Sequence, residues 1–271
     1  MTEMMVRPPA FSFPAPTKAV GGLLDLVHVT EGMGFMEPEG LAESYNTLRL
    51  DSVPVWPCPP GAPTTKDFNP SSWIDGIRFA VYGGVTCKGP GFDMAEAETK
   101  TRDAFLAMES VGVERALMTT RFIDGSEWDD VDDVTPAGGA ATPAVALALL
   151  EGAIACNYAG AGIIHASRAV ASLLTGVQGS VVREGDRLLT KLGTRVAAGG
   201  GYGCPNTGPS GAAPAAGVEW MFATGEIAVA RSDVFSQAEL DRATNDVYVL
   251  AERAYVAAVD GYVAAVQVKV A

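Results

Sequence analysis

The sequence is poor in positive charge. Its 271 residues carry 19 Lys and Arg against 32 Asp and Glu, a net charge of -13, and no stretch gathers a run of basic side chains. A surface that follows a phosphate backbone needs such a run, because the affinity comes from Lys and Arg that neutralise phosphates and release their counterions. The composition therefore excludes tight nucleic-acid binding, and we expect only weak, non-specific contact with DNA.

Residues of the types that bind zinc in structural sites, Cys and His, are also scarce. The chain has two histidines, and its four cysteines lie far apart with no CxxC spacing. They are Cys58, Cys87, Cys156 and Cys204. A structural zinc site needs four Cys or His ligands, usually in closely spaced pairs. We therefore expect reduced thiols in a cytoplasmic product, with no metal and no cofactor.

Long uninterrupted apolar segments are missing as well. The N-terminal residues carry Glu3 and several prolines, where a signal peptide has a cationic stretch followed by an apolar block. The most apolar region, 144–174, is interrupted by polar and charged residues that include Glu151 and Arg168. Since a membrane span needs about 20 mostly apolar residues in a row, we expect neither a signal peptide nor a membrane partner.

The sequence does have enough apolar residues, 48% of the chain, to bury a substantial core. Its 31 Gly and 17 Pro are gathered in a few stretches. Residues 1–22 and 51–91 are two of them, which predicts an extended arm and a long loop. Residues 199–217 are a third, and we expect an irregular connection there that contributes little core.

A long helix is predicted after Asp93. Asp93 and Glu96 have the spacing of a capping box, and apolar residues recur on one face of the following turns. That face comprises Met94, Ala97, Thr101, Ala104, Phe105, Met108 and Val111. Gly112 is expected to be a weak point before the helix continues.

The second half predicts a mixture of helices and strands. Thr142 and Pro143 mark the start of a helix that is apolar nearly all round and should be buried, and Ser167 caps a shorter helix. Strands are expected at 162–166, 192–198 and 219–231. Residues 247–259 and 262–270 are apolar, β-branched runs separated by Asp-Gly, which predicts a long terminal hairpin.

The order of these parts resembles that of the Hong Kong 97-type phage capsid proteins. The stretches that carry the resemblance are ERALMTTRF, GAGIIHASRAVASLL, LGTRVAAGGGY, EWMFATGEIAVARSDVF and NDVYVLAERAYVAAVDGYVAAVQV. The resemblance implies an α+β fold with five parts. They are an N-terminal arm (1–35), an extended loop with the first peripheral strands (36–91), a spine helix and peripheral domain (92–135), an axial domain (136–235) and a terminal peripheral β-hairpin (236–271).

The resemblance also implies a structural function. Copies of the chain are expected to form pentameric and hexameric capsomers of an icosahedral phage head that encloses double-stranded DNA. The location is then the virion capsid, after synthesis in the host cytoplasm, and portal, scaffold or decoration proteins are further partners. An encapsulin nanocompartment shell is the alternative, because it has the same fold. The first part of the chain is short for an extended loop, so we assign no crosslinking residue.

A small α/β enzyme or ligand-binding protein is less favoured. His165 and Ser167 share a strand face, but no acid lies nearby in sequence and GxSxG is absent, so a packed histidine is expected. The run GGGYGC fails the GxGxxG pattern of a dinucleotide loop. The acidic stretch 127–133 lacks the glycine and closing Glu of an EF-hand. The sequence therefore assigns no catalytic, cofactor-binding or metal-binding residue and predicts no enzymatic activity.

One residue is a candidate for contact between subunits. Tyr202 is the large side chain near the start of the glycine-rich segment 199–217. We expect this segment at the tip of the axial domain, facing the centre of a capsomer ring, where Tyr202 would contact a neighbouring copy.

Overall fold

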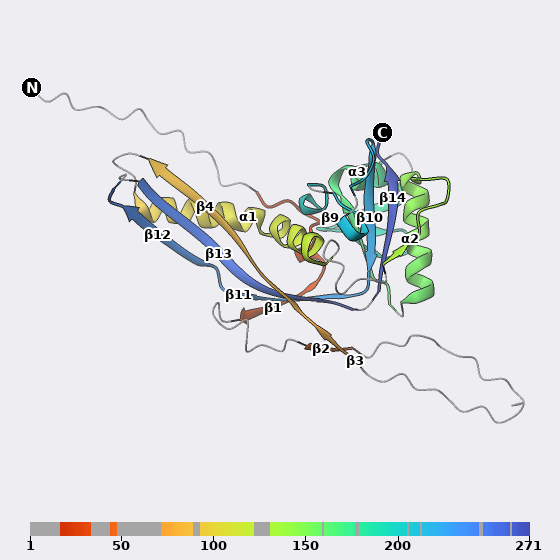
Figure 1. The fold of residues 1–271 in the computed structure, drawn as a ribbon, viewed down its shortest axis with the longest axis horizontal. Coiled ribbons are helices and arrows are strands. Elements are labelled where there is room, and N and C mark those ends of the chain that lie inside the picture. Colours follow the sequence, from red (N-terminus) through yellow and green to blue (C-terminus); the bar gives the residue numbers. More distant parts are fainter. Residues whose placement is uncertain are drawn as a thin grey trace, which may run out of the picture.

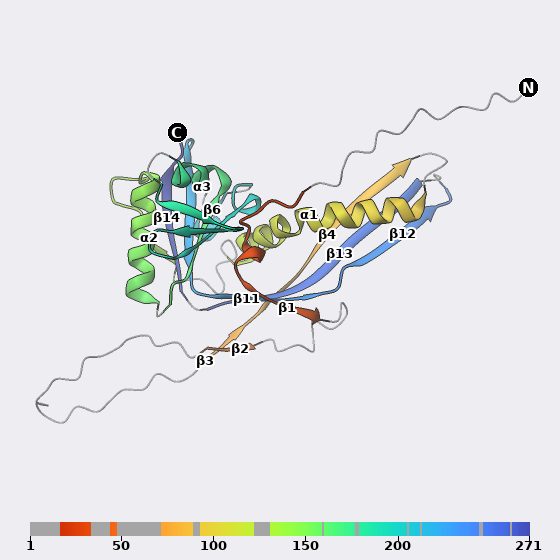
Figure 2. The same cartoon turned by 180° about the vertical axis from the view of Figure 1, so that it is seen from behind.

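The computed structural model describes residues 17–33, 44–47, 72–88, 93–121 and 131–271, apart from 159, 177–178, 205, 212, 244–245 and 261. These residues form an elongated lobe and a compact lobe (Figures 1 and 2). Each lobe combines helices with a large sheet, so the predicted α+β class is confirmed. No helix within the described ranges is long and apolar enough to cross a membrane.

The elongated lobe contains a five-stranded sheet in which the longest strand, β13, lies between β4 on one side and β11 and β12 on the other. The strands are β1 (His28–Met33), β4 (Ile77–Lys88), β11 (Ile227–Ser232), β12 (Phe235–Asp241) and β13 (Asp246–Val259). One face of this sheet is covered by α1 (Met94–Arg121), as Figure 1 shows. A separate two-stranded ribbon pairs β2 (Ser44–Thr47) with β3 (Ser72–Asp75).

The predicted long helix is confirmed. Asp93 caps it, since its carboxylate accepts hydrogen bonds from the backbone N–H groups of Ala95 (2.9 Å) and Glu96 (3.4 Å). With 28 residues α1 is about 42 Å long. The helix continues through Gly112, as expected. A Cβ on Gly112 would lie 2.3 Å from Cγ1 of Val81, so the glycine allows α1 to approach β4 closely.

The compact lobe is built on a seven-stranded sheet in the order β5-β14-β10-β6-β9-β8-β7. The strands are β5 (Asp132–Asp133), β6 (Ile163–Ser167), β7 (Val181–Glu184), β8 (Arg187–Thr190), β9 (Arg195–Gly199), β10 (Val218–Thr224) and β14 (Val263–Lys269). One face packs on α2 (Pro143–Asn157) and α3 (Arg168–Thr175). The other face packs on the C-terminal half of α1 and on the short 3-10 helices η1 (Leu23–Asp25) and η2 (Gly200–Tyr202), with a third, η3 (Pro209–Gly211), following.

The helices of the compact lobe begin where the sequence predicts. Pro143 opens α2, and Oγ of Ser167 caps α3 by accepting a hydrogen bond from the N–H of Val170 at 3.2 Å. The prediction that α2 is buried all round is wrong. Only the face that packs on the sheet is buried, and Val145 on another face is 49% exposed.

The predicted terminal hairpin does not form. The described residues of β13 pair with β4, β11 and β12, whereas those of β14 pair with β5 and β10 in the other sheet. β14 is buried along most of its length. Such burial is typical of a central strand that is covered on both faces, whereas a hairpin at the edge of a sheet would be more exposed. The apolar character that suggested a hairpin instead reflects this double coverage.

Segments 218–232 and 255–269 form one long antiparallel ribbon that bends from one sheet into the other. The pairing runs from Val218 with Lys269 to Thr224 with Val263, and resumes from Ile227 with Val259. Two residues on one segment therefore face three on the other, which is the count of a β-bulge. A bulge bends the strand that carries it, so this offset accounts for the turn between the lobes.

Candidate functional site

His165 lies in the core of the molecule, with no exposed face. Its Nδ1 is 2.9 Å from the hydroxyl of Tyr202 and its Nε2 is 2.8 Å from Oγ1 of Thr224. Burial lowers the pKa of His165 to about 3, so the ring is neutral at physiological pH. The prediction of a packed, hydrogen-bonded histidine is confirmed.

Ser167 has different hydrogen-bond partners from His165. Its hydroxyl donates to the carboxylate of Glu219 and accepts from the N–H of Val170 at the start of α3. None of the hydrogen bonds described for the two residues joins them. The pair therefore lacks the contact between nucleophile and base that covalent catalysis requires.

The acidic stretch 127–133 falls largely outside the described residues, with Asp132 and Asp133 described and exposed. In the part of the chain that can be described, no group of three or more His, Cys, Asp and Glu is arranged to hold a metal ion. His28 is exposed on β1, and Cys156 and Cys204 are free and exposed.

The glycines after β9 surround a buried carboxylate and not a phosphate. Glu114 on α1 accepts hydrogen bonds from the N–H groups of Leu23 (2.9 Å) and Gly201 (2.9 Å) and from the hydroxyl of Ser110 (3.0 Å). Burial raises the pKa of Glu114, and these three hydrogen bonds oppose the increase. A Cβ on Gly201 would lie 2.5 Å from Cβ of Glu114, so a larger residue there would displace this acid.

Tyr202 does not face a neighbouring subunit. The structure buries it inside its own chain, where it is 2% exposed and contacts the ring of His165 edge-on. The segment that it begins also contributes more core than the composition suggests, because Gly201 and Gly208 are buried as well. The amide of Asn206 fixes the segment to β10, since it donates to the carbonyl of Trp220 (3.1 Å) and accepts from its N–H (2.6 Å).

A network of charges that the sequence did not reveal joins α1 to the sheet of the elongated lobe. Glu109 accepts from Arg231 (2.8 Å), from Arg253 (2.5 Å) and from the hydroxyl of Tyr255. Arg231 also donates to both carboxylate oxygens of Glu31, and this hydrogen bonding lowers the pKa of Glu31. These residues come from α1, β1, β11 and β13, so no short motif in the sequence could predict them.

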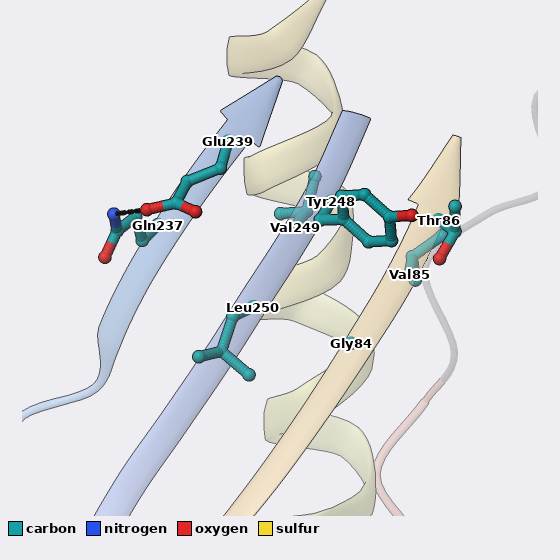
Figure 3. Close-up of a pocket in the computed structure, with 8 residues that line it drawn as sticks. All are labelled: Gly84, Val85, Thr86, Gln237, Glu239, Tyr248, Val249 and Leu250. Atoms are coloured by element: carbon teal, nitrogen blue, oxygen red, sulfur yellow. Dashed lines mark hydrogen bonds between the residues drawn. The ribbon is translucent and has the colours of Figure 1, made fainter. Parts of the chain in front are cut away.

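Several exposed apolar side chains lie on the elongated lobe beside β4. Tyr82 is 73% exposed, Met108 on α1 is 59% exposed, and Val85 and Tyr248 are about half exposed at 48% and 46%. A groove of about 320 Å³ runs between β4 and α1. On the opposite sheet face, a hollow of about 380 Å³ lies over β4, β12 and β13, with α1 behind the strands (Figure 3).

A second groove, of about 670 Å³, lies on the compact lobe between α2 and the turn after β8. Leu192 at its rim is 81% exposed. One oxygen of Glu151 accepts from Oγ1 of Thr194 at 2.8 Å, while the other is buried without a partner in the described structure. The surfaces of both lobes therefore offer apolar area for contact with other molecules, and the polar residues inside serve packing.

Comparisons with known proteins agree with this arrangement. The chain is similar to a capsid protein of cyanophage Pam1, with 11% identity over 100% of this chain and 98% of that one and a TM-score of 0.52. It is similar to the encapsulin of the holo-SrpI complex from Synechococcus elongatus PCC 7942, with 12% identity over 96% and 92% of the two chains and a TM-score of 0.52.

A third similar structure is the capsid of a native GTA particle, with 12% identity over 98% and 96% of the two chains and a TM-score of 0.50. No family model and no curated protein sequence matches the chain. Identities this low establish the fold alone, and they do so over the whole length of the chain. The chain therefore has the Hong Kong 97-type fold, as the order of its parts in the sequence implied.

Proposed function

We propose that this chain is the subunit of a closed protein shell. The observation that carries the proposal is the similarity of fold over nearly the full length of three proteins, each a capsid or encapsulin subunit. The interior of the chain supports it, because His165, Ser167 and Glu114 are all used in internal hydrogen bonds. No enzymatic activity is proposed.

The more specific proposal is a tailed-phage major capsid protein, whose copies form the pentamers and hexamers of an icosahedral head around double-stranded DNA. In this scheme the elongated lobe is the peripheral domain and the compact lobe is the axial domain. Contacts within a ring are heterologous, since one surface of each copy meets a different surface of the next. Such permanent contacts bury of order 2,000 Å² or more, for which the exposed apolar groups beside β4 are suited.

The arm belongs to the same proposal. Residues 1–16 lie outside the described residues. The residues that follow them, 17–25, are called the root of the arm here. The root is held in place, because Lys18 pairs with Asp25 (2.5 Å) and Arg168 donates to the carbonyl of Val20 (3.2 Å). From this root the proline-rich segment extends across a neighbouring copy. Other head proteins, such as portal, scaffold or decoration proteins, would then contact the assembled shell and not the single chain.

An encapsulin nanocompartment is the second candidate. It is favoured by one observation, the TM-score of 0.52 to the Synechococcus encapsulin, which equals that to the cyanophage capsid. The two candidates differ in what the shell contains, because a phage head encloses DNA and a nanocompartment encloses protein.

Expression of the full chain, alone and beside its native neighbouring genes, tests both proposals. Sedimentation and electron microscopy should reveal closed particles or their capsomers, far larger than the 28.1 kDa monomer. Nuclease-resistant DNA in particles from the native host supports the phage head, and a co-purified enzyme without DNA supports the nanocompartment. A chain that stays monomeric at high concentration and beside its neighbours would contradict the shell proposal.

A further inference from the structure

The long edge strand β4 is unusual for its exposure. Among the described residues, β4 pairs with β13 alone, so the backbone groups along its other side are not used in the sheet. Native proteins shield long edges of this kind with charge, with proline or with another element, because an open edge recruits further strands. The twelve residues of β4 contain no proline and carry charge only near their ends, at Arg78 and Lys88.

The side of β4 away from β13 is also bordered by apolar side chains. The groove between β4 and α1 is lined by these two elements only, with Phe105, Met108 and Val85 among its walls, so it lies beside the open edge. Tyr82, which also lines this groove, is 73% exposed. The paired glycines Gly83 and Gly84 leave the middle of the strand without side chains, a feature of strands that another backbone approaches closely.

These features specify the shape of the occupant. A strand added to an edge gains main-chain hydrogen bonds and places its side chains alternately on the two faces. Here one set of side chains would enter the groove beside Met108, and the other would lie on the opposite face, beside the hollow over β4, β12 and β13. We propose that the open edge of β4 binds residues 1–7 of a second copy of this chain as an added strand; this proposal rests on the shell function proposed above.

The chemistry of residues 1–7 fits this role. The segment MTEMMVR has no proline or glycine, so each internal residue can donate to a strand ladder. In an extended backbone Met4 and Val6 share one face, and the flexible methionine side chain fills irregular apolar grooves. Residues 48–53 (LRLDSV) also have no proline or glycine and alternate apolar with polar side chains over 48–51, so they are the competing occupant.

The spacer between this segment and its root favours a second copy. Residues 8–16 contain Pro8, Pro9, Pro14 and Pro16 and would span about 28 Å as a semi-rigid extended chain. The root is bound by Glu114, one residue from Arg115 at the near end of the groove. From Arg115 to Thr101 the groove covers about 21 Å of α1. A stiff spacer that runs along α1 would therefore carry the segment beyond the groove of its own chain.

Hydrogen exchange on the full chain tests the proposal. Assembled particles and unassembled subunits are compared, and amides of 77–88 should exchange at least about tenfold more slowly in the particles. Val6→Pro removes a donor from the added strand and should abolish this protection. Ala15→Pro, in the spacer, is the matched control and should behave as the wild type, because a proline is compatible with the extended spacer.

The groove is tested in the same way. Met108→Glu places a charge on an exposed wall, so the subunit should fold normally while protection of β4 is lost. Leu192→Glu makes the same kind of change on the compact lobe and should leave protection unchanged. Mixed particles of Met4→Cys and Met108→Cys chains, with the four native cysteines replaced by serine, should give a disulfide that joins two different chains.

Each result has one interpretation. Particles whose β4 amides remain unprotected, or whose protection survives Val6→Pro, overturn the docking proposal and leave the shell proposal intact. Protection lost only in Leu50→Pro assigns the site to residues 48–53 and also overturns it. A wild-type chain that forms no particle contradicts the shell function, and the docking proposal fails with it.

Discussion

Three buried polar side chains hold elements that are distant in sequence. Glu109 joins α1 to β11 and β13, Glu114 joins α1 to η1 and η2, and His165 joins β6 to η2 and β10. Each side chain is hydrogen-bonded, as burial requires, since an unpaired buried polar group costs about 1–3 kcal/mol. Glutamate and histidine are residue types that often act in catalysis, but at these three positions they fix how helices and strands are placed relative to one another.

His165 should make the stability of the subunit depend on pH. The unfolded chain binds a proton at this residue below about pH 6.5, whereas in the folded chain burial lowers the pKa of His165 to about 3. Between these values the unfolded state holds more protons, so acid destabilises the fold. The stability advantage of the wild type over His165→Gln should shrink by about 1.4 kcal/mol per pH unit as the pH falls through this range.

Urea unfolding of both proteins at several pH values from about 6.5 to 4 measures the difference. Leu192→Gln is the control, because Leu192 is exposed and the change alters no ionisable group. A constant difference between the wild type and His165→Gln would mean that the folded chain protonates this ring in the same range.

Glu114→Gln tests the cradle of backbone donors. The two oxygens of Glu114 accept from different N–H groups, Oε1 from Leu23 and Oε2 from Gly201. A glutamine must turn its NH₂ group toward one of them, so one buried donor loses its acceptor. We expect a loss of about 1–3 kcal/mol in unfolding free energy and faster proteolysis within 17–27. Glu184→Gln, on the exposed strand β7, should change neither measurement.

At the scale of elements, the sequence predicted what local chemistry determines. The caps Asp93 and Ser167 and the opening Pro143 act within one turn, so their helices begin where expected. The sequence-based prediction failed where the pairing of a strand depends on an element far away in the chain. The partner of β14 is β10, about 40 residues earlier in the chain, and the bulge, where 225–226 face 260–262, is invisible in either strand alone.

The candidate surface was missed for a related reason. Periodicity placed Met94 and Met108 on the buried face of α1, but they are 40% and 59% exposed. The sheet covers a narrower part of the helix than its apolar stripe, and Thr101 and Phe105 on the same stripe are buried. Conversely, Tyr202 was expected on a surface, because nothing in its glycine-rich surroundings indicates that η2 packs on α1.

Gly112 offers a test of helix–strand packing. In Gly112→Ala the new Cβ would lie 2.3 Å from Cγ1 of Val81, so α1 must move away from β4. We expect a loss of about 1–3 kcal/mol in the free energy of unfolding, despite the higher helix propensity of alanine. Val81→Ala in the same chain should recover part of the loss, because it removes the obstructing methyl group.

Gly152→Ala is the matched control for this change. Gly152 also lies inside a helix, α2, but a Cβ there meets nothing within 4 Å. Its replacement should therefore stabilise the chain by up to about 1 kcal/mol. Thermal unfolding of the three variants measures all of these effects. Equal stabilisation by Gly112→Ala would show that α1 and β4 are less closely packed than the structure indicates.

At the scale of the whole molecule, the bent ribbon makes the two lobes one mechanical unit. Its bend is fixed by Tyr158, whose hydroxyl donates to Asp260 at 2.9 Å and accepts from the N–H of Glu226 at 3.0 Å. Arg195 from β9 pairs with Glu226 and donates to the carbonyl of Leu26 at 3.1 Å. A subunit with a fixed angle between its lobes presents its surfaces in one orientation, as regular assembly requires.

Charge decides how such a shell can meet DNA. The chain has a net charge of -13, and Arg231 and Arg253 are paired with acids of the same chain, Glu31 and Glu109. We therefore expect weak binding of duplex DNA with a shallow dependence on salt.

A protein that makes six to ten phosphate contacts loses about 10³–10⁵ in affinity between roughly 50 and 200 mM salt. Titration of purified particles and subunits with labelled duplex at both concentrations gives the slope directly. Submicromolar binding at the lower concentration that collapses at the higher one would reveal a basic surface formed on assembly, and would contradict a shell whose inner wall does not adhere to its contents.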